Sequence, residues 1–416
     1  MARPRITLPL HPGYICAAVS PSPPAKSPTR AIVFLAVAGF ASQAMVRSAD
    51  SLLPQIATDL TVSVGAASII VSAYTVMHGS MQLITGPVGD RLDKYQVIAV
   101  ATALCGVAVM LCGFAQDLTL LTLARVASGA CAAWIIPLGM AYIGDVTPYE
   151  RRQQVLGRYL SGQITGQLFG QAAGGVIGDL FGWRAMFFVL AAIFALAALA
   201  LFRELAVNPA TRVPGRHEGS PRSLIGGYSL VLASPWARIV MLAVAVETAL
   251  AFGAFAYVGA DLHLRFGLNF TLVGLVVGAF GVGGLIYALA VKWLVGRLGQ
   301  SGLARYGSLM LGLAYLTLAF APAAWLAPLG VTLIGLGFYM LHNTLQTNAT
   351  QMTPQARGTA VALFSAAVYL GQTAGVALAA PIVDRAGAAP LFVIVAVLLP
   401  LLGMWFAAEL KRRAPL

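Results

Sequence analysis

The sequence predicts an all-α integral membrane protein of twelve transmembrane helices, arranged as two pseudo-symmetric six-helix bundles. Three observations support this fold class: an apolar composition, repeated apolar runs of membrane-spanning length, and a register between the two halves of the chain. Of the 416 residues, 59% are hydrophobic and only 10% are charged, whereas about a quarter of the residues in a soluble domain are charged. The composition therefore argues against a water-soluble globular protein.

The apolar runs have the length that a bilayer requires, because its hydrocarbon core needs about twenty mostly apolar residues per helix. Such segments occur twelve times, six in each half of the chain. They cover residues 31–57, 65–88, 96–115, 118–143, 154–177, 185–202, 238–259, 271–293, 304–321, 326–349, 359–382 and 389–408. Glycine is abundant at 44 residues, and small residues let membrane helices pack closely.

These segments divide the chain into five regions. We expect a disordered cytoplasmic tail at 1–30, a first six-helix bundle at 31–202, a cytoplasmic linker at 203–235, a second six-helix bundle at 236–410 and a cytoplasmic tail at 411–416. The first region is proline-rich and lacks the apolar run of a signal peptide. The linker is polar and basic, so we expect it to lie outside the bilayer.

The distribution of Lys and Arg predicts the orientation. The formal net charge is +12, and the 26 basic residues stand singly or in short groups between apolar runs, which does not favour nucleic-acid binding. With twelve spans and a cytoplasmic start, most fall on the cytoplasmic side, as the positive-inside rule requires. Those expected outside are Arg184, Arg265 and Arg385. We therefore predict a multi-pass protein of the plasma (bacterial inner) membrane with both termini cytoplasmic.

The second half of the chain repeats the first. At an offset of 206 residues Arg91 corresponds to Arg297, and at an offset of 205 Asp179 corresponds to Asp384. Other matched pairs are Gly129 with Gly335, Gly166 with Gly371, Gly170 with Gly375, Gly182 with Gly387 and Phe187 with Phe392. A register held over so many positions predicts two related bundles, a parallel repeat about an axis normal to the membrane.

Several motifs resemble the major facilitator superfamily and, within it, the twelve-span drug:proton antiporter branch. They are GPVGDRLDK at 86–94, LARVASG at 123–129, GQLFGQAAGG at 166–175, GWRAMFF at 182–188 and TPQARG at 353–358. The first resembles the signature loop between spans two and three, the second a fourth-span motif, and the third the antiporter motif of span five. The resemblance implies the major facilitator fold and alternating access, in which two bundles rock about a central site.

Eight residues are candidates for gating: Gly86, Asp90, Arg91, Lys94, Gly166, Gly170, Gly174 and Arg297. The resemblance assigns Asp90 and Arg91 to a charge cluster that latches one conformation, and an ordinary solvated loop is the alternative. In span five, glycines recur every four residues from 162 to 178 and form one smooth stripe for close helix contact. We interpret this stripe as a sliding surface between the two bundles.

Ionisable residues within the spans are candidates for proton coupling, because each costs about 2.5 to 3.5 kcal/mol to place at the centre of a bilayer. They are Asp50, Glu247 and Arg125. Asp50 shares a helical face with Arg47, so self-neutralisation is the alternative for this pair. Glu247 has no charged neighbour in its own span, and burial favours its neutral form; a hydrogen bond to another helix is the alternative. Arg125 resembles a family arginine that bears on proton transfer, and packing against carbonyl groups is its alternative.

Polar and aromatic residues in the spans are candidates for substrate binding, with packing or interhelical hydrogen bonding as the alternative for each. The set is Arg47, His78, Gln82, Trp134, Gln163, Gln167, Tyr257, Tyr339, His342, Asn343 and Gln346. The glutamine row of span five, which continues to Gln171, should face a protein partner or the cavity, because amides are costly in lipid. For His78 a core position is favoured over a proton carrier.

These features predict a secondary active transporter that exports small amphipathic or apolar, drug-like compounds by coupling to proton entry. The alternative is a proton symporter or uniporter for a small metabolite such as a sugar or carboxylate, which Arg47 and Arg125 favour if both face the cavity. No nucleotide-binding loop, metal-ligand pair or nucleophile elbow is present, so we expect no enzyme activity, cofactor or metal. The expected partners are a small-molecule substrate, protons and the lipid bilayer, with no nucleic acid and a monomeric chain.

Overall fold

The computed structural model describes residues 29–89, 92–212 and 221–413. Within these ranges the chain forms helices joined by short turns, and no strand occurs. Residues 1–28 of the expected tail at 1–30 and the pair Asp90 and Arg91 lie outside the described residues, whereas Thr29 and Arg30 begin α1. Of the expected tail at 411–416, residues 411–413 continue the last helix.

The first half of the chain forms nine helices within the described residues. They are α1 (Thr29–Arg47), α2 (Leu53–Asp59), α3 (Val64–Ala67), α4 (Ile69–Gly89), α5 (Lys94–Phe114), α6 (Leu118–Ala132), α7 (Ile135–Val146), α8 (Tyr149–Phe181) and α9 (Trp183–Val207). Helices α1 and α8 pack together, and so do α5 and α9. Buried apolar side chains of these helices fill the interior of this half.

The linker and the second half are helical as well. Their elements are η1 (Pro209–Thr211), α10 (Pro221–Ala233), α11 (Pro235–Phe255), α12 (Val258–Phe266), α13 (Phe270–Phe320), η2 (Ala324–Leu326), α14 (Ala327–Ala349), η3 (Pro354–Ala356), α15 (Arg357–Ala386) and α16 (Ala388–Arg413). Part of the expected linker is therefore the helix α10. Helices α13 and α14 pack together, and α11 packs on α15.

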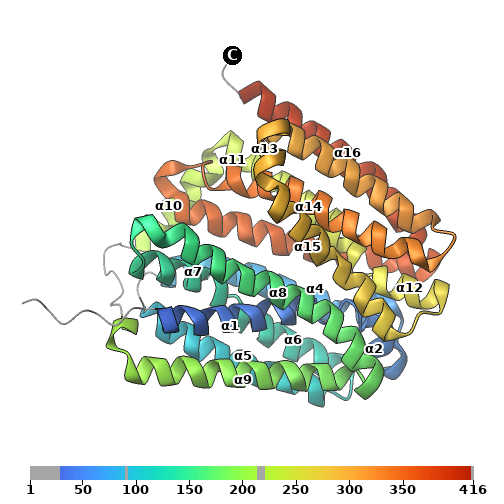
Figure 1. The fold of residues 1–416 in the computed structure, drawn as a ribbon, viewed down its shortest axis with the longest axis horizontal. Helices are drawn as coiled ribbons and strands as arrows, with labels where there is room; N and C mark the ends of the chain where they lie inside the picture. The colour runs from blue at the N-terminus through green and yellow to red at the C-terminus, as the bar shows by residue number, and fades with distance from the viewer. Residues whose placement is uncertain (1–28, 90–91, 213–220, 414–416) are drawn as a thin grey trace, which may run out of the picture.

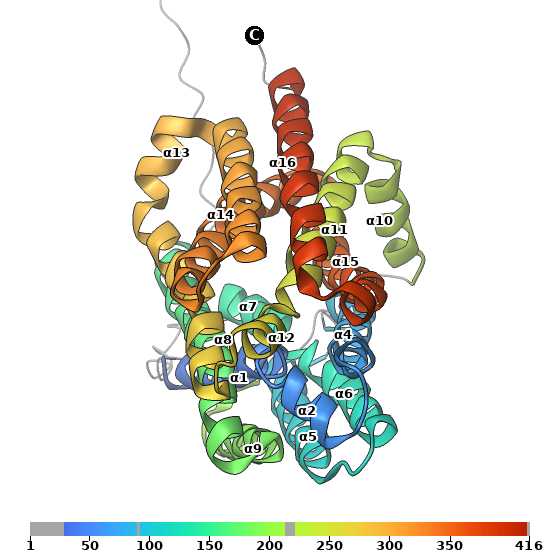
Figure 2. The same cartoon turned by 90° about the vertical axis from the view of Figure 1, so that its right-hand side faces the viewer.

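The two halves form two neighbouring bundles whose helices run in similar directions (Figure 1). Helix α8 contacts α13 and helix α4 contacts α15, so these pairs join the halves. One end of the molecule carries α2, α12 and the turn from α15 to α16, and we call it the Asp384 end (Figure 2). The opposite end carries the starts of α5, α8 and α11, and we call it the Lys94 end.

Ten helical stretches of the described residues are long and apolar enough to cross a membrane. The chain is therefore a multi-pass membrane protein. Two features separate this number from the expected twelve. Helix α8 has 33 residues but is not among the ten, and α13 counts once although it has 51 residues and a break at Gly299, where φ is 60° and ψ is 179°.

Local structure repeats between the halves. Ser63 and Asn269, which are 206 residues apart, cap the starts of α3 and α13 by accepting the amide hydrogen of the residue three positions later, at 3.0 and 2.9 Å. Gly182 and Gly387, which are 205 residues apart, precede α9 and α16 with φ of 82° and 72°. Only glycine adopts such values readily, so the same turn recurs for the same physical reason.

Candidate functional site

The first helix of each half is broken at an equivalent place. Helix α1 ends at Arg47 and α2 begins at Leu53, while α11 ends at Phe255 and α12 begins at Val258. The two breaks meet at the boundary between the halves, because a methyl group on Gly259 would lie 2.9 Å from the carbonyl oxygen of Asp50. Broken membrane helices expose backbone groups to bound solutes, so this boundary is the candidate site.

Arg47 and Asp50 form a buried pair at the break between α1 and α2. The Arg47 Nη1 atom lies 3.5 Å from Asp50 Oδ2, and only 5% and 1% of the two residues is exposed. Neither carboxylate oxygen of Asp50 has a hydrogen-bond partner among the described residues. The guanidinium of Arg47 also lies over the ring of Phe252 in α11, 3.7 Å from its centroid. The pair therefore neutralises itself in part and also contacts the second half.

Arg125 is fully buried within the first half and binds backbone carbonyl groups. Its Nε donates to the carbonyl of Ile70 at 3.0 Å, and its Nη1 donates to that of Met45 at 3.2 Å. Met45 lies in the last turn of α1, where carbonyl groups lack intrahelical partners. The guanidinium also covers the ring of Tyr74, 4.5 Å from its centroid. Arg125 thus caps the broken end of α1.

Glu247 and His342 form the corresponding polar pair of the second half. Glu247 in α11 is fully buried, and its Oε2 lies 2.9 Å from Nδ1 of His342 in α14. The imidazole stacks on Phe338, with ring centroids 4.7 Å apart. The other carboxylate oxygen, Oε1, has no hydrogen-bond partner among the described residues. The arrangement can hold or release a proton, because both groups are titratable and share one hydrogen bond.

His78 connects the first half to α15, and Gln82 hydrogen-bonds to its ring within the first half. The ring centroids of His78 and Tyr369 are 4.2 Å apart. The Nε2 atom of His78 lies 3.2 Å from the side-chain amide nitrogen of Gln82. Gln82 also approaches the carbonyl of Ala133, at 3.5 Å, where α6 ends and α7 has not begun. His78 is therefore a buried interface residue that contacts an aromatic ring of the other half.

Tyr257 lies at the break between α11 and α12 and bridges the halves. Its hydroxyl oxygen lies 2.8 Å from Ser68 Oγ and 2.9 Å from the carbonyl oxygen of Val376, and its one hydrogen can be donated to either acceptor. The other candidates of α14 differ in burial, since Tyr339 packs on Phe280 while Gln346 is exposed. Half-buried Asn343 follows His342 in the chain. Of these α14 candidates, only His342 forms a described hydrogen bond to α11.

Trp134 and the glutamines of α8 lie in the first half. Half-buried Trp134 lines a groove of about 470 Å³ between α4, α5 and α6. Gln163 and Gln171 are buried, and their side-chain nitrogens have no hydrogen-bond partner among the described residues. Gln167 is half-buried. The glutamines therefore retain free donors, whereas Trp134 occupies a different surface of this half.

The glycine stripe of α8 does not lie between the two halves. A methyl group on Gly162 or Gly174 would lie 3.0 or 2.9 Å from carbonyl oxygens of α1 or its end, and Gly166 and Gly170 approach the same helix more closely. The expectation of a sliding surface between bundles is therefore wrong for this stripe. It serves close packing of α8 on α1 within one half, because backbone contact requires the absence of side chains.

A neighbouring glycine makes the contact with the second half instead. A methyl group on Gly175 of α8 would lie 2.6 Å from the Cα of Gly274 in α13. Gly175 is the last residue of the GQLFGQAAGG motif and lies outside the four-residue period of the stripe. This position indicates a second face of α8 with its own helix contact. Helices α8 and α13 therefore cross backbone to backbone at this point.

The remaining gating candidates lie toward the Lys94 end. Lys94 Nζ forms an ion pair with Asp145 Oδ2 at 2.8 Å. Exposed Arg297 lies over the ring of Trp293, 5.8 Å from its centroid. Gly86 belongs to the last turns of α4. The described members of the predicted cluster are therefore at one end of the helices, away from the buried pairs.

Comparison with known proteins identifies the family. Residues 35–376 match the family model described as Major Facilitator Superfamily. The chain belongs to the major facilitator superfamily. This superfamily transporter is 29% identical over 332 residues to the uncharacterized MFS-type transporter YceJ of Bacillus subtilis (strain 168), covering 79% of this chain and 83% of that one. It is 23% identical over 384 residues to a probable sugar efflux transporter of Pasteurella multocida (strain Pm70), covering 90% and 92%.

Solved structures agree on the fold of this transporter. A bacterial homolog of the lysosomal transporter Spinster, in an inward-facing and unoccupied conformation, superposes with a TM-score of 0.70 at 17% identity and covers 93% of this chain and 98% of that one. The nucleoside transporter NupG superposes with a TM-score of 0.73 at 14% identity, covering 91% and 99%. The chain is thus a transporter of the superfamily and not an enzyme.

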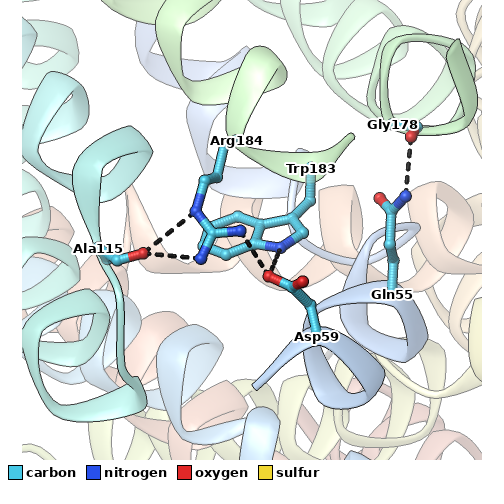
Figure 3. Close-up of polar contacts among 6 residues, drawn as sticks. All are labelled: Gln55, Asp59, Ala115, Gly178, Trp183 and Arg184. Carbon is cyan, nitrogen blue, oxygen red and sulfur yellow. Dashed lines mark hydrogen bonds and ion pairs between the residues drawn. The ribbon is translucent and has the colours of Figure 1, made fainter. Parts of the chain in front are cut away.

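Two residues of the GWRAMFF motif, Trp183 and Arg184, form a polar cluster with Asp59 at the Asp384 end of this transporter. The sequence alone does not indicate a role for this cluster. Asp59 of α2 accepts hydrogen bonds from Trp183 Nε1 at 3.0 Å and from Arg184 Nη1 at 2.5 Å (Figure 3). Arg184 also donates to the carbonyl of Ala115, at 3.2 Å through Nε and 3.0 Å through Nη2. The Arg184 and Trp183 donors hold the pKa of Asp59 below its usual value. The cluster ties α2 and the end of α5 to the start of α9.

In the second half of the transporter, an arginine binds the end of α13 in a similar way but comes from another element. Arg265 of α12 donates to the carbonyl groups of Leu318 and Ala319 at 2.6 and 3.0 Å, at the end of α13. It is held by Asp261 in the same helix, at 2.8 Å. A cation near the final carbonyl groups of a helix stabilises it. Both halves therefore use an arginine for one task and take it from different elements.

Proposed function

We propose that this transporter exports small amphipathic or apolar compounds in exchange for protons by alternating access. Both termini lie in the cytoplasm, and the Asp384 end faces outward. The distribution of basic residues supports this orientation, since positive charge is retained on the cytoplasmic side of a membrane. The Lys94 end carries Lys94, Arg297 and the terminal Lys411, Arg412 and Arg413.

We propose twelve crossings. The ten apolar stretches supply ten of them. Helix α13 supplies one more, because its 51 residues would reach about 76 Å at 1.5 Å per residue, whereas a bilayer core is about 30 Å thick. Its break at Gly299 supports a reversal there. Helix α8 supplies the twelfth, since its 33 residues are enough to cross the bilayer. Its glycines and glutamines lower its mean hydropathy but do not shorten the helix.

The observation that carries the coupling proposal is the pair Glu247 and His342. A carboxylate without exposed surface costs several kcal/mol unless it is paired. Here its single described partner, at 2.9 Å, is an imidazole whose side chain is 15% exposed. A proton that reaches His342 can pass to Glu247, and the site then changes charge within the membrane. We assign proton uptake to this pair.

The pair Arg47 and Asp50 forms the second element of the proposal. When Asp50 is ionised it attracts Arg47, and when it is protonated the attraction is lost. Arg47 contacts Phe252 of the other half. Protonation of Asp50 therefore changes a contact between the halves, which is what coupling to rocking requires.

The aromatic character of the interface supports an amphipathic or apolar cargo. Phe252, Phe338 and Tyr339 form ring contacts at centroid distances of 4.7 to 5.6 Å in the second half. Tyr369 and His78 form another across the halves. Aromatic surface binds apolar bodies and, through its faces, organic cations. These aromatic contacts and the small number of charged groups in the spans support the proposed cargo class.

The test uses everted membrane vesicles that contain the transporter, a pH-sensitive dye and a panel of lipophilic cations and neutral amphiphiles. Energised vesicles hold protons inside, and a transported compound should release them. Glu247→Gln should abolish this release, because an amide cannot take up the proton. Glu204→Gln is the matched control, since Glu204 is also buried at 5% exposure but pairs with Arg30 and Asn208. Release by Glu247→Gln equal to that of the unaltered protein would refute the coupling role.

A second candidate cargo is a small sugar. The similar protein of Pasteurella multocida is described as a probable sugar efflux transporter. The free amide donors of Gln163 and Gln171 supply the hydrogen bonds that sugar hydroxyl groups need. In the same vesicles, proton release on adding sugars and none on adding amphiphiles would favour this candidate over the first.

A further inference from the structure

A carboxylate of the second half caps a helix of the first half at the Asp384 end. Asp384 lies at the end of α15, and its Oδ2 accepts the hydroxyl of Ser63 at 2.7 Å. Its Oδ1 accepts the backbone amide of Gly65, in the first turn of α3, at 2.8 Å. An anion at a helix start is stabilised by the free amide groups and by the helix dipole. Asp384 therefore acts as a cap supplied by the other half.

Gly65 is required for this contact. A methyl group built on Gly65 would overlap the carboxylate of Asp384. Gly65 does not have a positive φ, so its backbone does not demand glycine for conformational reasons. Its lack of a side chain instead lets the carboxylate reach the amide.

The first half returns the same contact to the second. Asp179 lies near the end of α8, and its Oδ2 accepts the hydroxyl of Thr271 at 2.7 Å. The amide of Thr271, in the first turn of α13, points to the same oxygen at 3.4 Å. The contact lies beside the glycine crossing of α8 and α13. Each half therefore supplies one aspartate and receives one.

The two contacts are related by the repeat. Asp179 and Asp384 are 205 residues apart, and their targets Gly65 and Thr271 are 206 residues apart. No other carboxylate of the described residues forms a hydrogen bond to the opposite half. At the Lys94 end, the described hydrogen bond between the halves comes from Tyr228 of α10, which donates to the carbonyl of Leu83.

We propose that Asp179 and Asp384 form a reciprocal two-point latch that closes the Asp384 end and must release before that end opens. The proposal rests on the alternating access of the proposed function, and not on its proton coupling or its cargo. Both aspartates are exposed, so water replaces the broken bonds when the halves part. The latch is therefore weak enough to be reversible, as a transport cycle requires, and its two points act together.

The test measures distances between spin labels in the purified protein in detergent. One label pair reports the Asp384 end, with cysteines at exposed Gln116 and Pro322, which are 206 residues apart in the two halves. A second pair, at exposed Gln96 and Gln300, reports the Lys94 end. The background lacks the native cysteines, which are Cys16, Cys105, Cys112 and Cys131. The readout needs neither protons nor cargo, so the latch and the coupling proposal fail separately.

Asp384→Ala and Asp179→Ala should each raise the population with a long Asp384-end distance about fivefold, since a helix cap contributes about 1 kcal/mol. The double variant should raise it about 25-fold if the two caps add. The Lys94-end distance should shorten in the same molecules. Asp384→Asn, which keeps one acceptor oxygen, should give a smaller shift.

Two variants separate the latch from general loss of structure. Asp117→Ala removes an equivalent cap at the same end, where Asp117 accepts the Leu120 amide at 2.8 Å within one half, and it should leave both distances unchanged. Gly65→Ala should reproduce the shift of Asp384→Ala and add nothing to it in the double variant. Unchanged distances in both aspartate variants, or an equal shift in Asp117→Ala, would overturn the proposal.

Discussion

The two halves of this transporter share their backbone design and differ in their charges. Gly166 and Gly371, related by the repeat, each pack the fifth helix of a half directly on its first helix. The buried charged groups follow no such relation. At the offset of 205 that relates these two packing contacts, Arg47 of the first half corresponds to Phe252 of the second, and Glu247 of the second corresponds to Ser42 of the first.

The repeated glycine contacts belong to the helix packing of each half, whereas the unrepeated charged residues belong to the candidate site. Close backbone contacts recur, because both bundles have to pack their helices in the same way. Charged pairs are costly in the membrane, so each is retained once, where it has a task. The first half therefore carries a pair at the helix break, and the second carries the carboxyl and imidazole pair.

The largest expected effect comes from filling the shared helix crossing. Gly166→Leu should place a side chain against the carbonyl of Phe40 and destabilise the first half on the order of 3 kcal/mol. Gly371→Leu should do the same to the second half against Ala245. Thermal unfolding is followed by thiol labelling, with buried native Cys105 reporting the first half.

The control for this prediction is Gly157→Leu in the same helix, where an added Cβ atom meets nothing within 4 Å. It should leave the labelling temperature unchanged. The second half needs an introduced reporter, and buried Val395→Cys provides one. Equal damage from Gly157→Leu would mean that α8 tolerates no leucine anywhere, and the comparison of crossings would lose its basis.

The next effect tests a charge that only the first half has. Arg125→Met keeps the length of the side chain but removes the donors to Met45 and Ile70, so the first half should lose about 2 kcal/mol. Val331, at the corresponding position of the second half, has no such task. Labelling of Cys105 should therefore begin at a lower temperature while that of the second-half reporter is unchanged. Equal shifts of both reporters would show that Arg125 supports the whole molecule and not one helix break.

A smaller effect is expected at the two helix ends whose carbonyl groups are bound by an arginine from a different element in each half. Arg184→Gln and Arg265→Gln each remove a cation from a helix end, that of α5 or that of α13, which should cost about 1 kcal/mol. The first variant should affect the Cys105 reporter and the second the Val395→Cys reporter. If each change shifted the other half's reporter, the two caps would not be local devices.

The smallest effect concerns pH at the Asp59 cluster. Hydrogen bonds from Arg184 and Trp183 lower the pKa of Asp59 from 3.8, so its stabilisation is complete above that value and is lost as the pH falls through the lower folded value. Asp59→Asn should therefore be less stable than the unaltered protein near pH 7, and the difference should shrink below about pH 4. Melting temperatures in detergent across this range measure it. A difference that stays constant to pH 3 would contradict the assignment.

Most of the fold could be predicted from the sequence because hydropathy is a local property. Apolar runs mark the crossings wherever the helix faces lipid or an apolar partner. The prediction from hydropathy is weakest for a helix that packs mainly on other helices. Helix α8 is weakly apolar in sequence because it carries glycines that pack on α1 and α13 and a row of glutamines. The spacing of a glycine stripe does not show which helix the stripe contacts.

The candidate site could be predicted only in part, for a related reason. Glu247, His342, Arg47 and Asp50 stand out as polar residues in apolar runs, and all four lie in buried pairs. The partner of Glu247 is 95 positions away in the chain, so no spacing rule connects them. The cluster of Asp59 with Trp183 and Arg184 was hidden similarly, although the motif itself was visible.

The sequence by itself determined that the chain spans a membrane and that its second half repeats the first. It also determined which few charged residues lie within the apolar spans. Composition, period and register carry that information, because each depends on neighbours along the chain. Only the tertiary structure decided which helix each glycine touches, which base accompanies Glu247 and which helix start each outer aspartate caps. Those choices depend on how distant helices are brought together, and that is a property of packing.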